Sequence, residues 1–165
     1  RVHIKNAMIH AWKGYRDHAY GADELQPMTG GQNNRWSNIA ITMVDSLDTL
    51  WLLDMKKEFT DARDWIRDNL SHDKDHYAST FETTIRSLGG LLSAYDWSGD
   101  DVFLEKAKDL GNRLIKAFDG NKSGLPYARI NLSTGQAKNE SWLRDAINIA
   151  SAGTLQIEFR YLSKV

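Results

Sequence analysis

Cysteine is missing from this 165-residue sequence, and so is any block of like charges. The absence of cysteine excludes disulfides and thiolate metal sites within these residues, although it does not by itself fix the compartment. No apolar run approaches the roughly 20 residues that would span a bilayer. Residues 1–5 also lack the apolar region of a signal peptide. We therefore expect any targeting segment or membrane anchor to lie outside this chain.

The charge balance argues against a polyanionic partner. The sequence holds 21 basic and 22 acidic residues, which gives a formal net charge of -1. Such a chain lacks the positive field that draws nucleic acid to a protein surface, so no nucleic-acid partner is expected. It also contains no P-loop, dinucleotide fingerprint or nucleophile elbow.

The composition is that of folded protein, with 41% hydrophobic and 26% charged residues. This indicates one globular domain or a piece of a larger one. Asn-x-Ser sequons occur at Asn69, Asn121, Asn131 and Asn139, more often than chance provides. Because such sequons are glycosylation acceptors, their number favours a secretory route.

Helical periodicity dominates, and glycine and proline fall between the periodic segments. The sequence therefore predicts a nearly all-α protein with long loops at 21–36 and 120–140. Helices are predicted over residues 2–19, 39–55, 56–70, 80–95, 101–118 and from about 142 to the end.

The predicted helices alternate in character. Residues 39–55 are apolar on most sides and residues 80–95 carry little charge, whereas 56–70 and 101–118 are amphipathic. A helix that is apolar nearly all round is expected to be buried among other helices. The alternation predicts helical hairpins arranged as an inner and an outer ring.

Glu82 and Arg86 are the first candidates for chemistry, because they lie four residues apart on one predicted helix face. Ser79 and Glu82 also fit a capping box, and the Glu-Arg pair fits a surface ion pair, so structural roles are the alternative. The neighbouring residues are apolar. Partial desolvation favours the protonated carboxyl that a general acid needs.

Other acidic residues each admit both structural and functional interpretations. Asp45 and Asp48 lie three apart on the apolar helix, either bonding neighbouring backbone groups or contacting a substrate. Glu158 lies between apolar residues and could form a buried ion pair or contact a ligand. Asp23 and Glu24 could form a helix cap, a turn or part of a site. The histidines His3, His10, His18, His72 and His76 are interpreted as solvated.

Seven strings, in this order along the chain, resemble the class I α-mannosidases, glycoside hydrolase family 47. Each string is weak alone, but together they are specific. They are AWKGY at 11–15, DELQP at 23–27, VDSLDTL at 44–50, FETTIR at 81–86 followed by LGGLLSAY at 88–95, SGLPY at 123–127, NL at 131–132 and GTLQIEF at 153–159.

The resemblance implies an (α/α)₇ barrel, of which residues 1–165 would be the N-terminal portion of a single catalytic domain. It implies inverting hydrolysis of terminal α-1,2-linked mannose from high-mannose N-glycans in the ER or Golgi lumen, or by a secreted enzyme. Glu82 matches the family's catalytic acid and Arg86 the adjacent pocket arginine. Glu158 and Asp45 match pocket-side acids that would bind substrate.

The resemblance also implies a calcium ion, whose ligand is expected in the part that follows this chain. The base carboxylate is not evident here either, and Ser151 stands where many processing members have Glu. The resemblance does not decide between the processing branch and the ER-degradation-enhancing branch of the family. A non-catalytic mannose-glycan-binding module of the quality-control branch is the alternative function, and a helical scaffold the third. If the chain is an arc of a ring, Leu155, Ile157 and Phe159 are expected to face water or another molecule.

Overall fold

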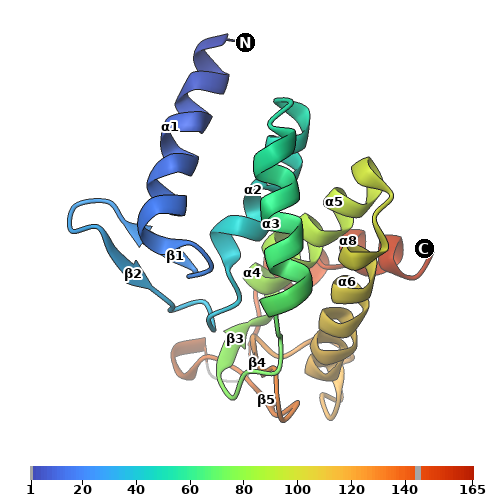
Figure 1. Cartoon of the computed structure of the whole chain (residues 1–165). Helices are drawn as coiled ribbons and strands as arrows, with labels where there is room; N and C mark the ends of the chain where they lie inside the picture. The colour runs from blue at the N-terminus through green and yellow to red at the C-terminus, as the bar shows by residue number, and fades with distance from the viewer. Residues whose placement is uncertain (1, 144–145) are drawn as a thin grey trace.

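The computed structural model describes residues 2–143 and 146–165 and is mostly helical (Figure 1). Short non-α stretches are the π-helix η1 (Thr83–Leu88) and the 3-10 helices η2 (Ile115–Phe118) and η3 (Ser141–Leu143). The α-helices are α1 (Val2–Ala19), α2 (Ile41–Leu52), α3 (Lys56–Asn69), α4 (Thr80–Glu82), α5 (Gly89–Ser98), α6 (Asp101–Leu114), α7 (Ile149–Gly153) and α8 (Gln156–Leu162).

The first five predicted helices are all present. Four of them differ from the prediction at their ends, and the one predicted over 80–95 is also interrupted by the π-helix η1. The helix predicted over 39–55 is shorter, because Ala40 adopts a left-handed backbone with φ 53° and Leu53 ends the helix. The prediction of one helix from about 142 to the end is wrong. The segment is divided into α7 and α8, and its residues 144–145 lie outside the described residues.

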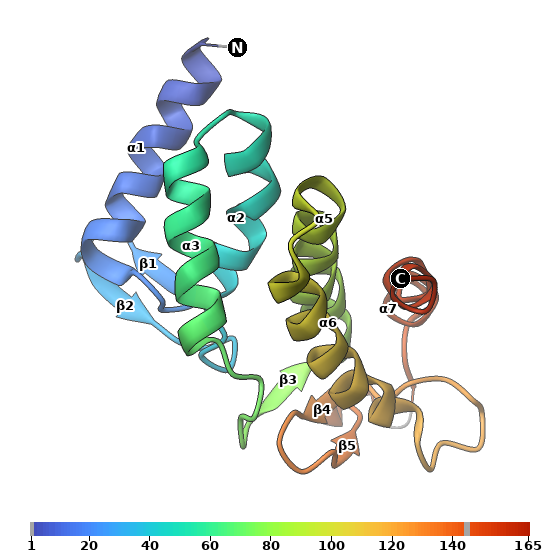
Figure 2. The same cartoon turned by 45° about the vertical axis from the view of Figure 1, so that its right-hand side comes forward.

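The helices form two layers, as the alternation of apolar and amphipathic segments predicts. In the inner layer α2 packs against α5, whereas α3 and α6 lie outside them and contact each other (Figure 2). On α3 only one face is buried, through Phe59, Ala62 and Ile66. The close approach of α2 and α5 depends on Gly90, where a Cβ would lie 2.9 Å from the carbonyl oxygen of Val44.

Both predicted long loops contain strands, which the sequence analysis missed. In the first, β1 (Glu24–Gln26) pairs with β2 (Gly31–Asn33) as an antiparallel hairpin. In the second, β4 (Arg129–Asn131) pairs with β5 (Ala137–Lys138), and β4 also pairs with β3 (Tyr77–Ser79). Strands of two or three residues are too short to show a period-two pattern. The three-stranded sheet lies at one end of the helices, next to the start of α4 (Figure 1).

Asp23 fixes the segment that leads into α2. Its buried carboxylate accepts hydrogen bonds from the backbone N–H groups of Trp36, Asn38 and Ile39 at 2.9, 2.8 and 2.7 Å. These bonds hold a strained stretch, in which Ser37 has a φ of 80° and Asn38 one of 54°. Of the alternatives for Asp23, the structure supports a structural role, because the buried carboxylate holds the loop that precedes α2.

The solvated interpretation of the histidines is wrong for His72, which is buried, and right for the other four, which are exposed. The His72 Nδ1 atom lies 3.0 Å from a carboxylate oxygen of Asp109 on α6. Burial lowers the pKa of His72, and the hydrogen bond with His72 lowers the pKa of Asp109 to about 2. The sequence around His72 is polar and gives no sign of burial. The ring is buried because α6, which is distant in sequence, packs against it in the folded chain.

Candidate active site

Glu82 lies at the end of the first turn of a helix that begins directly after strand β3. The Ser79 side chain caps this helix, because its Oγ accepts a hydrogen bond from the Glu82 N–H at 3.2 Å. The reciprocal half of the predicted capping box is not seen. Among the described residues, the Glu82 carboxylate has no hydrogen-bond partner, so it is available to a ligand.

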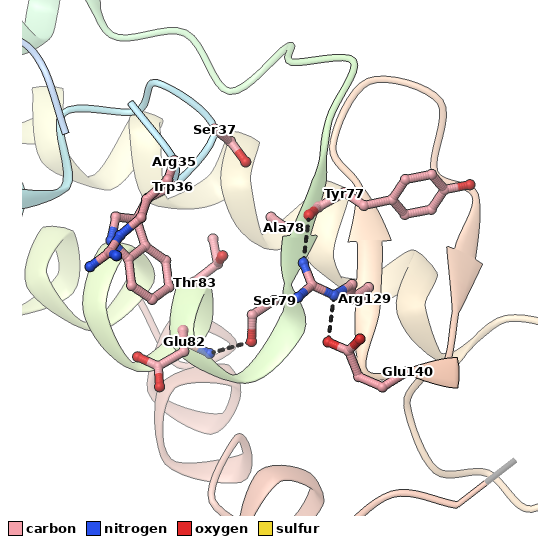
Figure 3. A pocket seen from close by; sticks show the side chains of 10 residues that line it. All are labelled: Arg35, Trp36, Ser37, Tyr77, Ala78, Ser79, Glu82, Thr83, Arg129 and Glu140. Carbon is pink, nitrogen blue, oxygen red and sulfur yellow. Dashed lines mark hydrogen bonds and ion pairs between the residues drawn. The ribbon is translucent and has the colours of Figure 1, made fainter. Parts of the chain in front are cut away.

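The Glu82 side chain lines a pocket of about 500 Å³, the size range of small-ligand sites. Three segments that are distant in sequence surround it: residues 35–37 before α2, residues 77–83 and the β4–β5 region. Figure 3 shows Glu82 and the Trp36 ring on one side of this space, and Arg129 and Glu140 on the other. We call this the Glu82 pocket.

Arg86 and Asp45 form an ion pair beside this pocket. The Arg86 Nε and Nη2 atoms donate to Asp45 Oδ2 at 2.9 and 2.6 Å. The guanidinium also lies 4.7 Å from the ring centroid of Trp36. The Arg86 side chain is 25% exposed and therefore not free in solvent. Trp36 stands between this ion pair and the space that Glu82 lines.

The spacing argument for Glu82 and Arg86 needs a correction. Four residues apart, they were expected to share a face of an α-helix, but residues 83–88 form a π-helix with a different angular spacing. Within the part of the chain that the structure describes, Arg86 pairs with Asp45 and not with Glu82. The carboxylate and the guanidinium are thereby separated rather than neutralised against each other.

Glu158 lies apart from the other predicted site residues. It lines a separate pocket of about 230 Å³ together with Gly89, Ser93 and Tyr161. Its Oε2 atom is buried without a hydrogen-bond partner in the described structure, and burial raises the pKa of its carboxyl group. Asp48, the other acid of the inner helix, accepts a hydrogen bond from Ser93 at 3.0 Å.

Several lining residues were missed by the sequence analysis. Trp36 lies in the segment that Asp23 holds, and its indole Nε1 donates to Glu24 at 3.0 Å. Arg129 pairs with Glu140, and its Nη1 donates to the carbonyl oxygen of Tyr77 at 3.2 Å. An aromatic residue in a glycine- and asparagine-rich loop was the only available signal, since the Arg129–Glu140 pair depends on strand pairing.

Similarity to known proteins identifies the family of this chain. The profile of glycosyl hydrolase family 47 matches residues 7–165. This chain belongs to glycosyl hydrolase family 47. It is 50% identical over 165 residues to the mannosyl-oligosaccharide 1,2-α-mannosidase MNS1 of Arabidopsis thaliana, covering 99% of this chain and 29% of that protein. It is 46% identical over 162 residues to the endoplasmic reticulum mannosyl-oligosaccharide 1,2-α-mannosidase of Rattus norvegicus, covering 98% and 24%.

The family-47 chain also matches the solved structure of the α-1,2-mannosidase from Trichoderma reesei. The TM-score is 0.88 at 25% sequence identity, over 99% of this chain and 36% of that one. The predicted fold class, a helical chain that forms part of an α/α barrel, is thereby confirmed. The chain spans less than a third of the length of these two curated relatives.

Neither a metal cluster nor a membrane span is found in the described part of this family-47 chain. Its His, Asp and Glu side chains form no group of three or more that could hold a metal ion. None of its helices is long and apolar enough to cross a membrane.

Proposed function

We propose that residues 1–165 form the N-terminal portion of an α/α-barrel catalytic domain that removes terminal α-1,2-linked mannose from high-mannose N-glycans with inversion. One observation carries the proposal. Glu82, in a family-47 chain, presents a carboxylate without a described partner to a pocket of about 500 Å³. The relatives' names supply the substrate class, since they are called mannosyl-oligosaccharide 1,2-α-mannosidases.

In this proposal Glu82 is the general acid that protonates the leaving glycosidic oxygen, directly or through a water. Arg86 is held by Asp45 and Trp36, so its charge keeps a fixed position beside the pocket and helps to orient the substrate. Trp36 provides an apolar ring face toward a sugar. Glu158, in its separate pocket, binds substrate only if further chain closes the two pockets into one cavity.

Inversion needs a second carboxylate, about 6.5–9.5 Å from the acid, that activates the attacking water. Glu140 faces the same pocket, but its pairing with Arg129 makes it a poor base. We therefore expect the base in residues beyond this chain. The same holds for calcium, because the described residues offer no group of ligands for it.

The proposed function implies a location in the secretory pathway. This means the ER lumen, the Golgi lumen or the outside of the cell. The rat relative is named as an endoplasmic reticulum enzyme, and the sequon residue Asn69 is exposed at the end of α3. The sequon at Asn131 offers no support. Its side chain is 5% exposed, donates to Asp75 and accepts from the Ser133 N–H, so it cannot carry a glycan in the folded chain.

The test is Glu82→Gln in the full-length protein that carries this segment, assayed by mannose release from an α-1,2-linked oligosaccharide with added calcium. Loss of a general acid lowers kcat by about 10²–10⁴-fold. The fold should persist, because the Ser79 cap uses the backbone N–H of residue 82 and not its carboxylate. Calorimetry should still detect oligosaccharide binding.

Ser79→Ala is the matched control. It removes the cap at a cost of about 0.5–2 kcal/mol in unfolding free energy and leaves the carboxylate in place. Although Ser79 also lines the pocket, kcat should therefore fall far less than in Glu82→Gln. Normal turnover by Glu82→Gln would contradict the acid role. A wild-type protein that binds the oligosaccharide without ever releasing mannose would instead be the glycan-binding module.

A further inference from the structure

The fold places the side chains of the four Asn-x-Ser sequons, at Asn69, Asn121, Asn131 and Asn139, in different surroundings. An N-glycan is a bulky, hydrophilic group, so the asparagine that carries it must lie at the surface with open space around it. The glycan is joined to the side-chain nitrogen Nδ2, which must therefore be free of bonds that hold it within the fold. These two requirements separate the four asparagines.

Three of the sequons fail one of these requirements. Asn131 is buried, and its Nδ2 donates to an aspartate at 2.8 Å. Asn69 is exposed, but its Nδ2 donates to a backbone carbonyl oxygen of α3 at 3.0 Å. Asn139 lines a pocket that shares residues with the Glu82 pocket, so a glycan there would obstruct the approach of a substrate.

Asn121 is the sequon residue that meets both requirements. It is partly exposed, and its Oδ1 accepts hydrogen bonds from the backbone N–H and the side-chain hydroxyl of Ser123 at 3.1 and 2.7 Å. These bonds fix the oxygen end of the amide, whereas Nδ2 has no partner among the described residues. Because both donors lie two residues along the chain, this turn depends on local sequence and not on contacts with distant segments.

The loop between η2 and β4, which contains Asn121, provides the open space. Gly120 and Gly124 flank the sequon with φ angles of 77° and 73°, and a Cβ at either position would meet nothing within 4 Å. Figure 2 shows the chain between α6 and β4 reaching out to the edge of the molecule. The loop lines neither the Glu82 pocket nor the pocket of Glu158, so a glycan here leaves both open.

We propose that Asn121 is an N-glycan attachment site of this protein. The inference rests on the secretory location that the proposed function implies, and it adds a modification that hydrolysis does not require. In the transfer, a C–N bond forms between Asn121 Nδ2 and the anomeric carbon of an oligosaccharide carried on a lipid diphosphate. The bond from that carbon to the diphosphate oxygen breaks, the lipid diphosphate leaves with the bonding electrons, and Nδ2 loses one of its two protons.

The experiment is peptide mass spectrometry of the full-length protein that carries this segment, produced in eukaryotic cells. An amidase that removes N-glycans leaves aspartate in place of a glycosylated asparagine, so the peptide with Asn121 should show this change and the peptide with Asn131 should not. Ser123→Ala removes the hydroxyl that completes the sequon and should lower the intact mass by one glycan.

Ser133→Ala is the matched control, because it destroys the sequon at Asn131 in the same way. The mass of the attached glycans should not change. The fold should persist in this control, since Ser133 donates to Asn131 through its backbone N–H. A glycan found on Asn131 would contradict the argument from burial.

Mannose release, measured on the same samples, keeps this inference separate from the proposed function. Ser123→Ala should leave kcat unchanged, because the loop lies outside the Glu82 pocket. An unmodified Asn121 would overturn the attachment site, whether or not the protein releases mannose. A protein that carries the glycan and releases no mannose would refute the hydrolysis and leave the attachment site in place.

Discussion

At the scale of single residues, the site depends on which charged groups are paired and which are left available. Arg86 donates to Asp45 and lies against the Trp36 ring, whereas the Glu82 carboxylate has no partner in the described part of the chain. Had the two been an ordinary i,i+4 pair, the arginine would stabilise the ionised carboxylate and oppose its action as an acid. The pairing of Arg86 with Asp45 is therefore compatible with the acid role proposed for Glu82.

Arg86→Lys tests the planar contacts of the guanidinium. Lysine keeps the charge but cannot donate to Asp45 from two nitrogens or lie flat on Trp36, so kcat/KM should fall by about 5–30-fold. Steady-state kinetics of mannose release measure this. Arg67→Lys is the control, because the ion pairs of Arg67 within the described residues are with Asp64 and Asp68 on its own helix. An unchanged kcat/KM for Arg86→Lys would refute the positioning role of Arg86.

At the scale of elements, the contact between α2 and α5 determines where Asp45 meets Arg86. Asp45 follows Val44 on α2, and Val44 packs against Gly90, four residues beyond Arg86. Any side chain at Gly90 would push the two helices apart and move the ion pair. Gly90 thus links helix packing to the geometry of the site.

Adjacent glycines allow a matched comparison of this contact. Gly90→Ala places a Cβ 2.9 Å from a backbone oxygen, a clash that should lower the unfolding free energy by about 1–3 kcal/mol. Gly89→Ala meets nothing closer than 3.6 Å and should be neutral or stabilising by up to about 1 kcal/mol, because alanine favours helix. Urea unfolding of both variants measures the difference, and equal effects would contradict the close-packing argument.

At the scale of the whole molecule, large apolar side chains remain uncovered near the C-terminal end of the described chain. Trp142 is 76% exposed, Ile149 90% and Ile157 67%. The expectation that Leu155, Ile157 and Phe159 face water is right only for Ile157. Leu155 is buried and Phe159 packs edge-on against Phe118, because α8 folds back onto α5 and α6.

Residues 1–165 produced alone are therefore expected to be marginally stable and inactive. Each large apolar side chain that stays exposed loses about 1.5–3 kcal/mol of stabilisation from burial. Three such losses approach the unfolding free energy of a typical domain, which is about 5–15 kcal/mol. Circular dichroism should show helices with a weak, low-temperature melt, and no mannose should be released in the presence of calcium. Calcium-dependent turnover by a monodisperse, cooperatively melting monomer would refute this prediction.

The helices, their layering and the main site candidates could be predicted from local patterns of residues. Apolar periodicity is local, and it marked α1, α2, α3 and α6 within a few residues of their ends. The seven family strings identified Glu82 and Arg86, and the family itself is confirmed.

How these residues meet could not be predicted, because it depends on contacts between distant segments. The Glu82 pocket joins residues 35–37 with 129 and 140, and the pairing of Arg86 with Asp45 spans 41 positions of sequence. His72 is buried by a helix that begins 29 positions later, at Asp101. Contacts of this kind arise from packing and strand pairing between distant segments, and no local pattern of residues records them.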